Sequence, residues 1–131
     1  MVEKLIRSKE EWRRLLPPDH FHLLFENGTE APYHNKYAEF WETGTYVCFA
    51  CGLPVFSSAA KFNSGTGWPS FWEPASADAV EEQEDHSFFV TRTAVVCARC
   101  GGHLGHVFND GPPPTGLRYC LNSGALDFKP E

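Results

Sequence analysis

The order of apolar and polar residues divides the chain into a short helical beginning and a longer strand-rich body. Ser8, followed three residues later by a glutamate, forms a capping-box pattern that predicts a helix running toward Leu16. A second short helix is expected to begin near Pro18 or Asp19 and to end at Gly28. The first part of the chain therefore predicts two short helices.

Beyond this segment, β-branched and aromatic residues alternate with polar ones between Gly, Pro, Asn and Ser, which is typical of short strands and turns. One helical turn is expected around Tyr37–Trp41, and the acidic residues 73–87 predict a surface connection. The pattern thus predicts a mainly β protein, a β-rich α+β fold with mostly antiparallel strands. The expected strands are Thr45–Ala50, Leu53–Ser57, Phe88–Val96, His106–Asn109, Leu117–Asn122 and Ala125–Phe128.

Length and charge narrow the class of protein. A chain of 131 residues, 42% of them apolar, predicts one domain over residues 1–131, with the helical segment 1–28 packed on it. The formal charge of -6 argues against nucleic acid as a partner. The longest apolar stretches, such as Val47–Phe56, are too short to cross a bilayer, so no membrane partner is expected. The charged N-terminal sequence lacks the apolar core of a signal peptide. We expect a cytoplasmic monomer, and an organelle is also compatible.

Four of the five cysteines fall into two matching motifs, Cys48-x-x-Cys51-Gly and Cys97-x-x-Cys100-Gly. Two such turns are typical of a tetrahedral zinc site with four cysteine ligands. Four thiolates leave no open position on the ion, so this zinc would be structural rather than catalytic. Two disulfides or a redox motif are the alternatives, but disulfide frameworks belong mainly to small secreted chains. We therefore expect one structural Zn²⁺.

The fifth cysteine, Cys120, falls within a predicted strand. Because alternate residues of a strand share a face, Arg118, Cys120 and Asn122 are expected to point one way and the residues between them into the core. A guanidinium near a thiol favours the thiolate and lowers its pKa, which suits a nucleophile. A buried, inert cysteine with Arg118 in an unrelated ion pair is the alternative.

Two histidines, His103 and His106, lie in a glycine-rich segment that ends with Asp110. Histidine suits proton transfer near neutral pH. Asp110 either orients one of the rings or shapes the turn at Gly111. The alternative is a pair of surface or hydrogen-bonded histidines with no role in chemistry.

A large aromatic residue, Trp68, stands among glycines in the segment Ser64-Gly-Thr-Gly-Trp-Pro. The glycines leave backbone space beside the indole, which suits the wall of a site for a small apolar group. A tryptophan packed in the core is the alternative.

Together, four segments resemble methionine-R-sulfoxide reductases, the B type of methionine sulfoxide reductase. The segments are CFACG, KFNSGTGWPSFW, CARCGGHLGHVFNDGP and TGLRYCLNSGALDF, in the order of the family, and the resemblance covers about residues 28–128. The resemblance implies two small antiparallel sheets forming a barrel-like body, with zinc opposite the active site. It also implies reduction of the R epimer of methionine sulfoxide, because each epimer has its own enzyme.

The resemblance implies that Cys120 attacks the sulfoxide sulfur and becomes a sulfenic acid. His103 or His106 would protonate the oxygen, with the other histidine and Asp110 holding the orientation. The residues implied around the substrate are Trp68, His103, His106, Phe108, Asp110, Arg118 and Asn122. The implied substrates are oxidised proteins or peptides that carry methionine-R-sulfoxide.

One position departs from the family pattern. Many members carry a second cysteine, which recycles the enzyme, where this chain has Thr66. The remaining four thiols belong to the zinc motifs. We therefore expect no intramolecular disulfide, and reduction of the Cys120 sulfenic acid by an external thiol such as thioredoxin, glutaredoxin with glutathione, or a small thiol.

Three other functions remain open from the sequence. A non-enzymatic zinc-ribbon binding module would explain the four zinc cysteines but not Cys120 and its neighbours. A relative that has lost catalysis is disfavoured because the residues of the implied site are present. An enzyme for free methionine sulfoxide, or for another sulfoxide metabolite, would carry the same residues.

Overall fold

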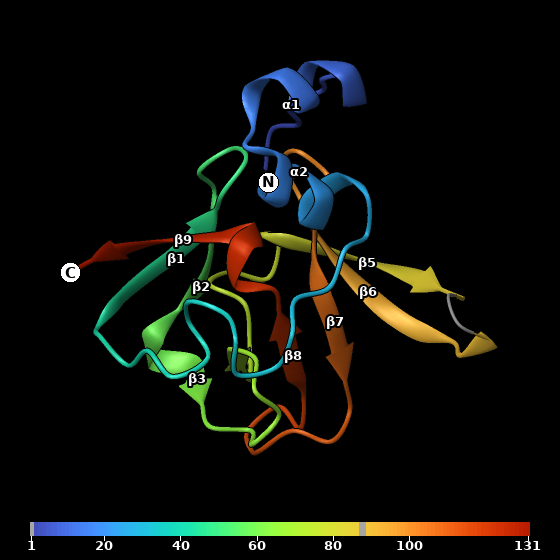
Figure 1. The fold of residues 1–131 in the computed structure, drawn as a ribbon. Coiled ribbons are helices and arrows are strands. Elements are labelled where there is room, and N and C mark those ends of the chain that lie inside the picture. Colours follow the sequence, from blue (N-terminus) through green and yellow to red (C-terminus); the bar gives the residue numbers. More distant parts are fainter. Residues whose placement is uncertain (1, 87–88) are drawn as a thin grey trace.

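The computed structural model describes residues 2–86 and 89–131 (Figure 1). Two short helices come first, α1 (Lys9–Leu15) and α2 (Pro18–Phe25). The predicted capping box is confirmed, because the Ser8 hydroxyl accepts the Glu11 amide and the Glu11 carboxylate accepts the Ser8 amide. Buried side chains on both helices and a 2.7 Å hydrogen bond between His20 Nδ1 and the Gly124 carbonyl dock this segment on the strands.

The body consists of two antiparallel sheets, which confirms the predicted fold class. Three strands form the smaller sheet in the order β2-β1-β9, and six form the larger in the order β3-β4-β8-β7-β6-β5. Short 3₁₀ turns cover Ser58–Ala60 and Ser123–Ala125. The strands are β1 (Gly44–Cys48), β2 (Pro54–Ser57), β3 (Lys61–Phe62), β4 (Ser70–Phe71), β5 (Val80–Asp85), β6 (Arg92–Cys97), β7 (His103–Phe108), β8 (Arg118–Leu121) and β9 (Leu126–Pro130).

An aromatic core fills the space between the two sheets. Phe71 of β4 packs on Tyr46 of β1 and Phe56 of β2, with ring centroids 5.1 and 4.7 Å apart. Tyr119 of β8 lies 5.6 Å from the Phe56 ring. Tyr119 and Leu121 are buried while Cys120 between them is half-buried, so the predicted alternation of faces along β8 is confirmed.

Several expected elements differ from the structure. The segment expected as an acidic surface connection contains strand β5, which forms the edge of the larger sheet. Most of its side chains are exposed, so the strand lacks the apolar alternation that sequence reasoning requires, and its charges suit an unpaired edge. The expected helical turn at Tyr37–Trp41 is a hydrogen-bonded turn instead of a helix. The strand expected to start at Phe88 starts at Arg92, and Phe88 itself lies outside the described residues.

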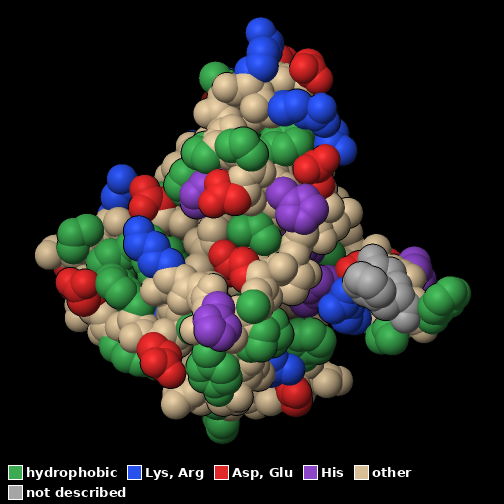
Figure 2. Space-filling view, in the orientation of Figure 1, with side chains coloured by type: hydrophobic (Ala, Val, Ile, Leu, Met, Phe, Trp, Pro, Cys, Tyr) green, Lys and Arg blue, Asp and Glu red, His purple; other side chains and the backbone are tan. Residues whose placement is uncertain are grey.

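Side chains of both charges lie on the surface (Figure 2). On the described part of the face in Figure 2, Lys and Arg side chains are interspersed with Asp and Glu side chains. Among residues 2–86 and 89–131, no helix has both the length and the apolar character needed to span a bilayer.

Candidate active site and metal centre

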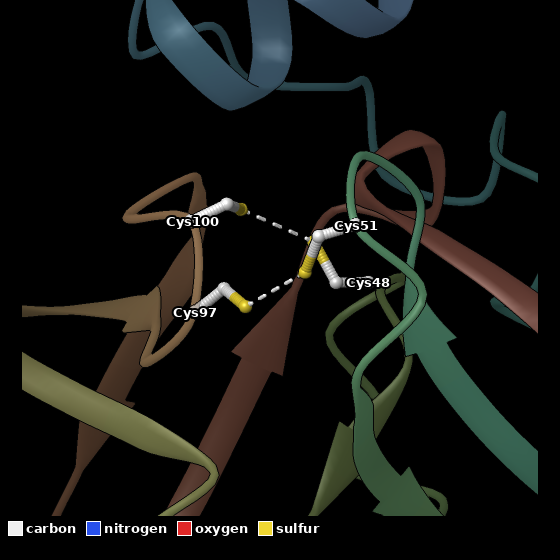
Figure 3. Close-up of side chains that lie close together, drawn as sticks. All are labelled: Cys48, Cys51, Cys97 and Cys100. Atoms are coloured by element: carbon white, nitrogen blue, oxygen red, sulfur yellow. Dashed lines mark hydrogen bonds between the residues drawn. The ribbon is translucent and has the colours of Figure 1, made fainter. Parts of the chain in front are cut away.

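Four cysteines form a compact cluster where the two sheets meet (Figure 3). Cys48 and Cys51 come from the turn after β1, and Cys97 and Cys100 from the turn after β6. The four Sγ atoms lie within 4.8 Å of one another, and all four cysteines are free thiols. The alternative of two disulfides therefore does not describe this structure.

Each turn has the same local geometry. The Gly52 amide donates to the Cys48 carbonyl at 2.8 Å, and the Gly101 amide donates to the Cys97 carbonyl at 2.9 Å. Both glycines have positive φ, +80° and +78°, a conformation that a residue with a Cβ rarely adopts. The glycine after each motif therefore lets the chain turn back and leaves both sulfurs of the pair facing the same point.

The cluster fits a tetrahedral metal ion. Sulfurs at about 2.3 Å from a zinc ion lie about 3.8 Å apart, and Sγ atoms here are 3.6 Å apart for Cys48–Cys100 and 3.5 Å for Cys51–Cys97. Hydrogen bonding to Cys100 raises the pKa of the Cys48 thiol. Four thiolates this close would repel one another, and a bound cation would offset that repulsion. A bound ion would tie β1 of the smaller sheet to the β6–β7 turn of the larger one.

The fifth cysteine lies in a pocket of about 250 Å³. Cys120 is on a central strand, opposite His106 of β7 on one side and Ser70 of β4 on the other. Directly opposite residues have Cβ atoms about 5 Å apart and project from the same face. The pocket brings together six of the predicted site residues, Trp68, His106, Phe108, Arg118, Cys120 and Asn122.

The environment of Cys120 corrects one expectation. Burial raises the pKa of this thiol, while Arg118 and a hydrogen bond with Thr66 oppose the shift without reversing it. Arg118 lowers the pKa of Cys120 as expected, but by less than burial raises it. The Arg118 guanidinium also pairs with Asp110, since Nε and Nη2 donate to the two carboxylate oxygens at 2.9 and 3.2 Å. The guanidinium also covers the Phe108 ring at 4.4 Å. The resting Cys120 is therefore biased toward the protonated thiol.

Asp110 pairs with Arg118, which lowers the pKa of the Asp110 carboxyl. In this structure Asp110 contacts Arg118, and the carboxylate beside a histidine is that of another residue. His106 Nε2 lies 2.7 Å from Asp85 Oδ2, and Arg92 Nη2 donates to the same oxygen at 3.4 Å. Sequence reasoning missed Asp85 because its acidic segment was not predicted to be a strand.

The two histidines lie on the same side of β7 but line two different cavities. A register shift in the β6–β7 pairing, between Val95 and Val96, lets residues three apart share a side, and the rings are 5.2 Å apart edge to face. His103 lines a separate cavity beside α2. Burial lowers the pKa of His103 to about 4, which keeps it neutral. His106 is thus the histidine that borders the Cys120 pocket.

One residue that sequence reasoning did not find, Glu30, connects two walls of the pocket. Its carbonyl accepts the Trp68 indole N–H at 3.0 Å, and its amide donates to Asn122 Oδ1 at 3.3 Å. Its carboxylate accepts the amides of Ser123 and Gly124. The Asn122 side-chain amide also donates to a carbonyl, that of Gly28. Asn122 therefore anchors the segment after α2, in addition to lining the pocket.

Comparisons with known proteins show the family of this chain. The SelR domain family matches residues 16–130. A curated protein of Methanosarcina barkeri named peptide methionine sulfoxide reductase MsrB is 52% identical over 132 residues, covering 100% of this chain and 93% of its own. MsrB proteins of Bradyrhizobium diazoefficiens and Pseudomonas putida are 53% and 51% identical over 129 and 130 residues, covering 98% and 99% of this chain and 93% and 98% of theirs.

A family match over most of the chain and identities near one half show that this chain belongs to the SelR family. All three of these relatives carry the name peptide methionine sulfoxide reductase MsrB. The resemblance read from the sequence motifs is thereby confirmed.

Proposed function

We propose that this protein is an oxidoreductase that reduces methionine-R-sulfoxide, in peptides or proteins, with Cys120 as its nucleophile. The observation that carries the proposal is the position of Cys120. It lies in a pocket, opposite His106 and beside the Trp68 and Phe108 rings. Membership of the SelR family and the names of the relatives support the same reaction.

The reaction balances with a protonated Cys120. The Cys120 sulfur attacks the sulfoxide sulfur and forms an S–S bond, while the sulfoxide oxygen is protonated and its bond to the methionine sulfur breaks. The S–S bond then breaks as that oxygen, or the oxygen of a water that replaces it, bonds to the Cys120 sulfur, so that Cys120 ends as a sulfenic acid and methionine leaves. Two electrons pass from the cysteine sulfur to the methionine sulfur. The thiol proton must leave Cys120 and reach the oxygen, and His106 lies opposite Cys120, where its ring can carry that proton. His103, the other candidate donor, borders the neighbouring cavity.

The walls of the pocket favour one epimer. The Trp68 and Phe108 rings form an apolar wall suited to the substrate methyl group, and His106 offers a polar side for the oxygen. With methyl and oxygen fixed, Cys120 can approach the sulfur from one direction, which distinguishes R from S. Arg118 and Asn122 complete the polar side, and Asp110 holds Arg118 through its carboxylate.

Regeneration requires a thiol from outside the chain. The four other thiols form the cluster at the junction of the sheets. Position 66, whose side chain forms a hydrogen bond with Cys120, is a threonine. Thioredoxin, glutaredoxin with glutathione, or a small thiol would attack the sulfenic acid, release water and leave a mixed disulfide that a second thiol reduces.

Zinc is the metal that best suits the four-cysteine cluster. Cys48, Cys51, Cys97 and Cys100 would hold one Zn²⁺, and the S₄ donor set at tetrahedral spacing is typical of structural zinc. Coordination of the ion by cysteines from both sheets would link the two sheets. We also propose that residues 1–131 act as one domain, as a monomer, in the cytoplasm.

A single-turnover experiment tests the proposal. Reduced, zinc-loaded protein is mixed with a peptide carrying methionine-R-sulfoxide, without reductant, and the S epimer serves as the control. We expect about one equivalent of methionine per chain from R and none from S. No methionine from either epimer, with folded protein, would favour the alternative of a non-enzymatic zinc-ribbon binding module.

A further inference from the structure

Three cross-strand pairs place a carboxylate from the sheet edge beside the proposed proton carrier. Asp85 of β5 lies opposite Arg92 of β6, and two residues further along β6, Ala94 lies opposite His106 of β7. His106 in turn lies opposite Cys120. Opposite residues share a face and so do alternate residues of one strand, so all five side chains project from the same face of the larger sheet.

The Asp85 side chain reaches across β6 to His106. Its Oδ2 atom lies 2.7 Å from His106 Nε2, a distance typical of charge-assisted hydrogen bonds. Ala94 lies opposite His106 on the strand between Asp85 and His106. Its side chain is only a methyl group, so it does not block the contact between Asp85 and His106. The side chains of Asp85 and His106 are 19% and 13% exposed, so water competes little for this hydrogen bond.

We propose that Asp85 is a positioning residue that holds a hydrogen on His106 Nε2, so that Nδ1 is the atom that exchanges the proton between Cys120 and the sulfoxide oxygen. The inference rests on the proposed function. An ionised carboxylate can only accept hydrogen bonds, so the ring nitrogen facing Asp85 carries a hydrogen in either charge state of the ring. Nδ1 is then free to take the Cys120 proton and to give it to the oxygen.

Arg92 supports the same arrangement from β6. Its Nη2 donates to the oxygen that accepts from His106, and the Arg92 side chain also lines the Cys120 pocket. The guanidinium therefore places a positive charge beside the Asp85 carboxylate. Asp85, the last residue of β5, is partly buried, whereas the four residues before it, from Glu81 to Glu84, are exposed.

The test compares Asp85→Ala and Asp85→Asn with the matched control Glu84→Ala. Glu84 is the neighbouring carboxylate on β5, and its side chain is 72% exposed. Zinc content and melting temperature are checked for each variant. The first readout is kcat and KM for a methionine-R-sulfoxide peptide with dithiothreitol as reductant. The second is the pair of ¹⁵N chemical shifts of the His106 ring, which report which nitrogen carries the hydrogen.

We expect Asp85→Ala to lower kcat roughly tenfold or more, with KM changed by less than about twofold, because orientation of the proton carrier is lost and substrate contacts remain. The His106 shifts should change from the Nε2–H form to a mixture. Asp85→Asn keeps an oxygen acceptor at the same size, so it should keep the Nε2–H form with a smaller loss of kcat. Glu84→Ala should match the wild type in both readouts.

Wild-type kcat in Asp85→Ala, or unchanged His106 shifts, would overturn the inference. An equal fall of kcat in Glu84→Ala would do so too, because it would indicate a general effect of charge near the sheet edge. Failure of the proposed function is distinguishable. In that case the wild type itself reduces no R-sulfoxide, and the shifts alone decide whether Asp85 holds the Nε2 hydrogen.

Discussion

The five cysteines lie in two regions, a cluster of four and a pocket that contains Cys120. The two regions are similar in burial and differ in the residues that surround the sulfur atoms. The four clustered cysteines lie on turns at the junction of the sheets, with each sulfur surrounded by the other three. Cys120 lies in the middle of a strand, with a histidine, a guanidinium and two aromatic rings around an open pocket. Four neighbouring sulfurs suit a metal ion, whereas one sulfur beside a histidine and a cavity suits a reactive thiol.

The two regions are connected through one hairpin. The turn between β6 and β7 carries Cys97 and Cys100, and the strand that follows presents His106 to Cys120. A metal ion that fixes this turn therefore also fixes the strand that positions the histidine. The comparison predicts different losses when each region is altered.

Replacing the reactive cysteine should have the largest effect. We expect Cys120→Ser to lower the single-turnover rate of methionine release by a factor on the order of 10³ or more, because a serine hydroxyl is a far weaker nucleophile here. Zinc content and melting temperature should stay at wild-type values. Substantial activity in this variant would remove the distinction between the two regions.

Replacing a cluster cysteine should instead reduce stability. We expect Cys97→Ser to lose the metal and several kcal/mol of unfolding free energy, since one of four ligands is gone. Denaturant unfolding together with metal analysis measures both. Full stability without metal would show that the cluster does not hold the sheets together.

A second thiol near Cys120 should allow an intramolecular disulfide to form after turnover. In Thr66→Cys the new thiol replaces a side chain that forms a hydrogen bond with Cys120. The thiol should therefore attack the sulfenic acid and form a disulfide. Thiol titration after one turnover should then show two fewer free thiols than before turnover. Ser64→Cys, two residues away, is the comparison and should form this disulfide less readily.

A smaller effect concerns His103 and pH. Burial lowers its pKa from 6.5 to about 4. The unfolded chain therefore takes up this proton more readily than the folded protein as pH falls from about 6.5 to about 4, and stability is lost in that window. The full shift corresponds to about 3 kcal/mol.

His103→Gln should remove that part of the pH dependence, whereas His34→Gln, at an exposed histidine, should not. The measurement is the unfolding free energy of the three proteins at several pH values between 4 and 7. The same slope in His103→Gln and the wild type would contradict the account.

Much of the site could be predicted because its residues follow local rules. The glycines after each cysteine pair predicted the turns, and the alternation along β8 predicted that Arg118 and Cys120 share a face. Asp85 and Glu30 could not be predicted. Asp85 reaches His106 through the pairing of three strands, and Glu30 reaches Trp68 through a loop without periodic pattern. The partner of Arg118, and with it the pKa of Cys120, likewise depends on tertiary contacts.

The most direct test is to locate the oxidised cysteine. Zinc-loaded wild type is given one equivalent of a methionine-R-sulfoxide peptide in the presence of a sulfenic-acid trap, and the adducts are mapped by mass spectrometry. The account predicts one adduct, on Cys120, with the metal retained. An adduct on any of the four clustered cysteines, or a disulfide between one of them and Cys120, would contradict it.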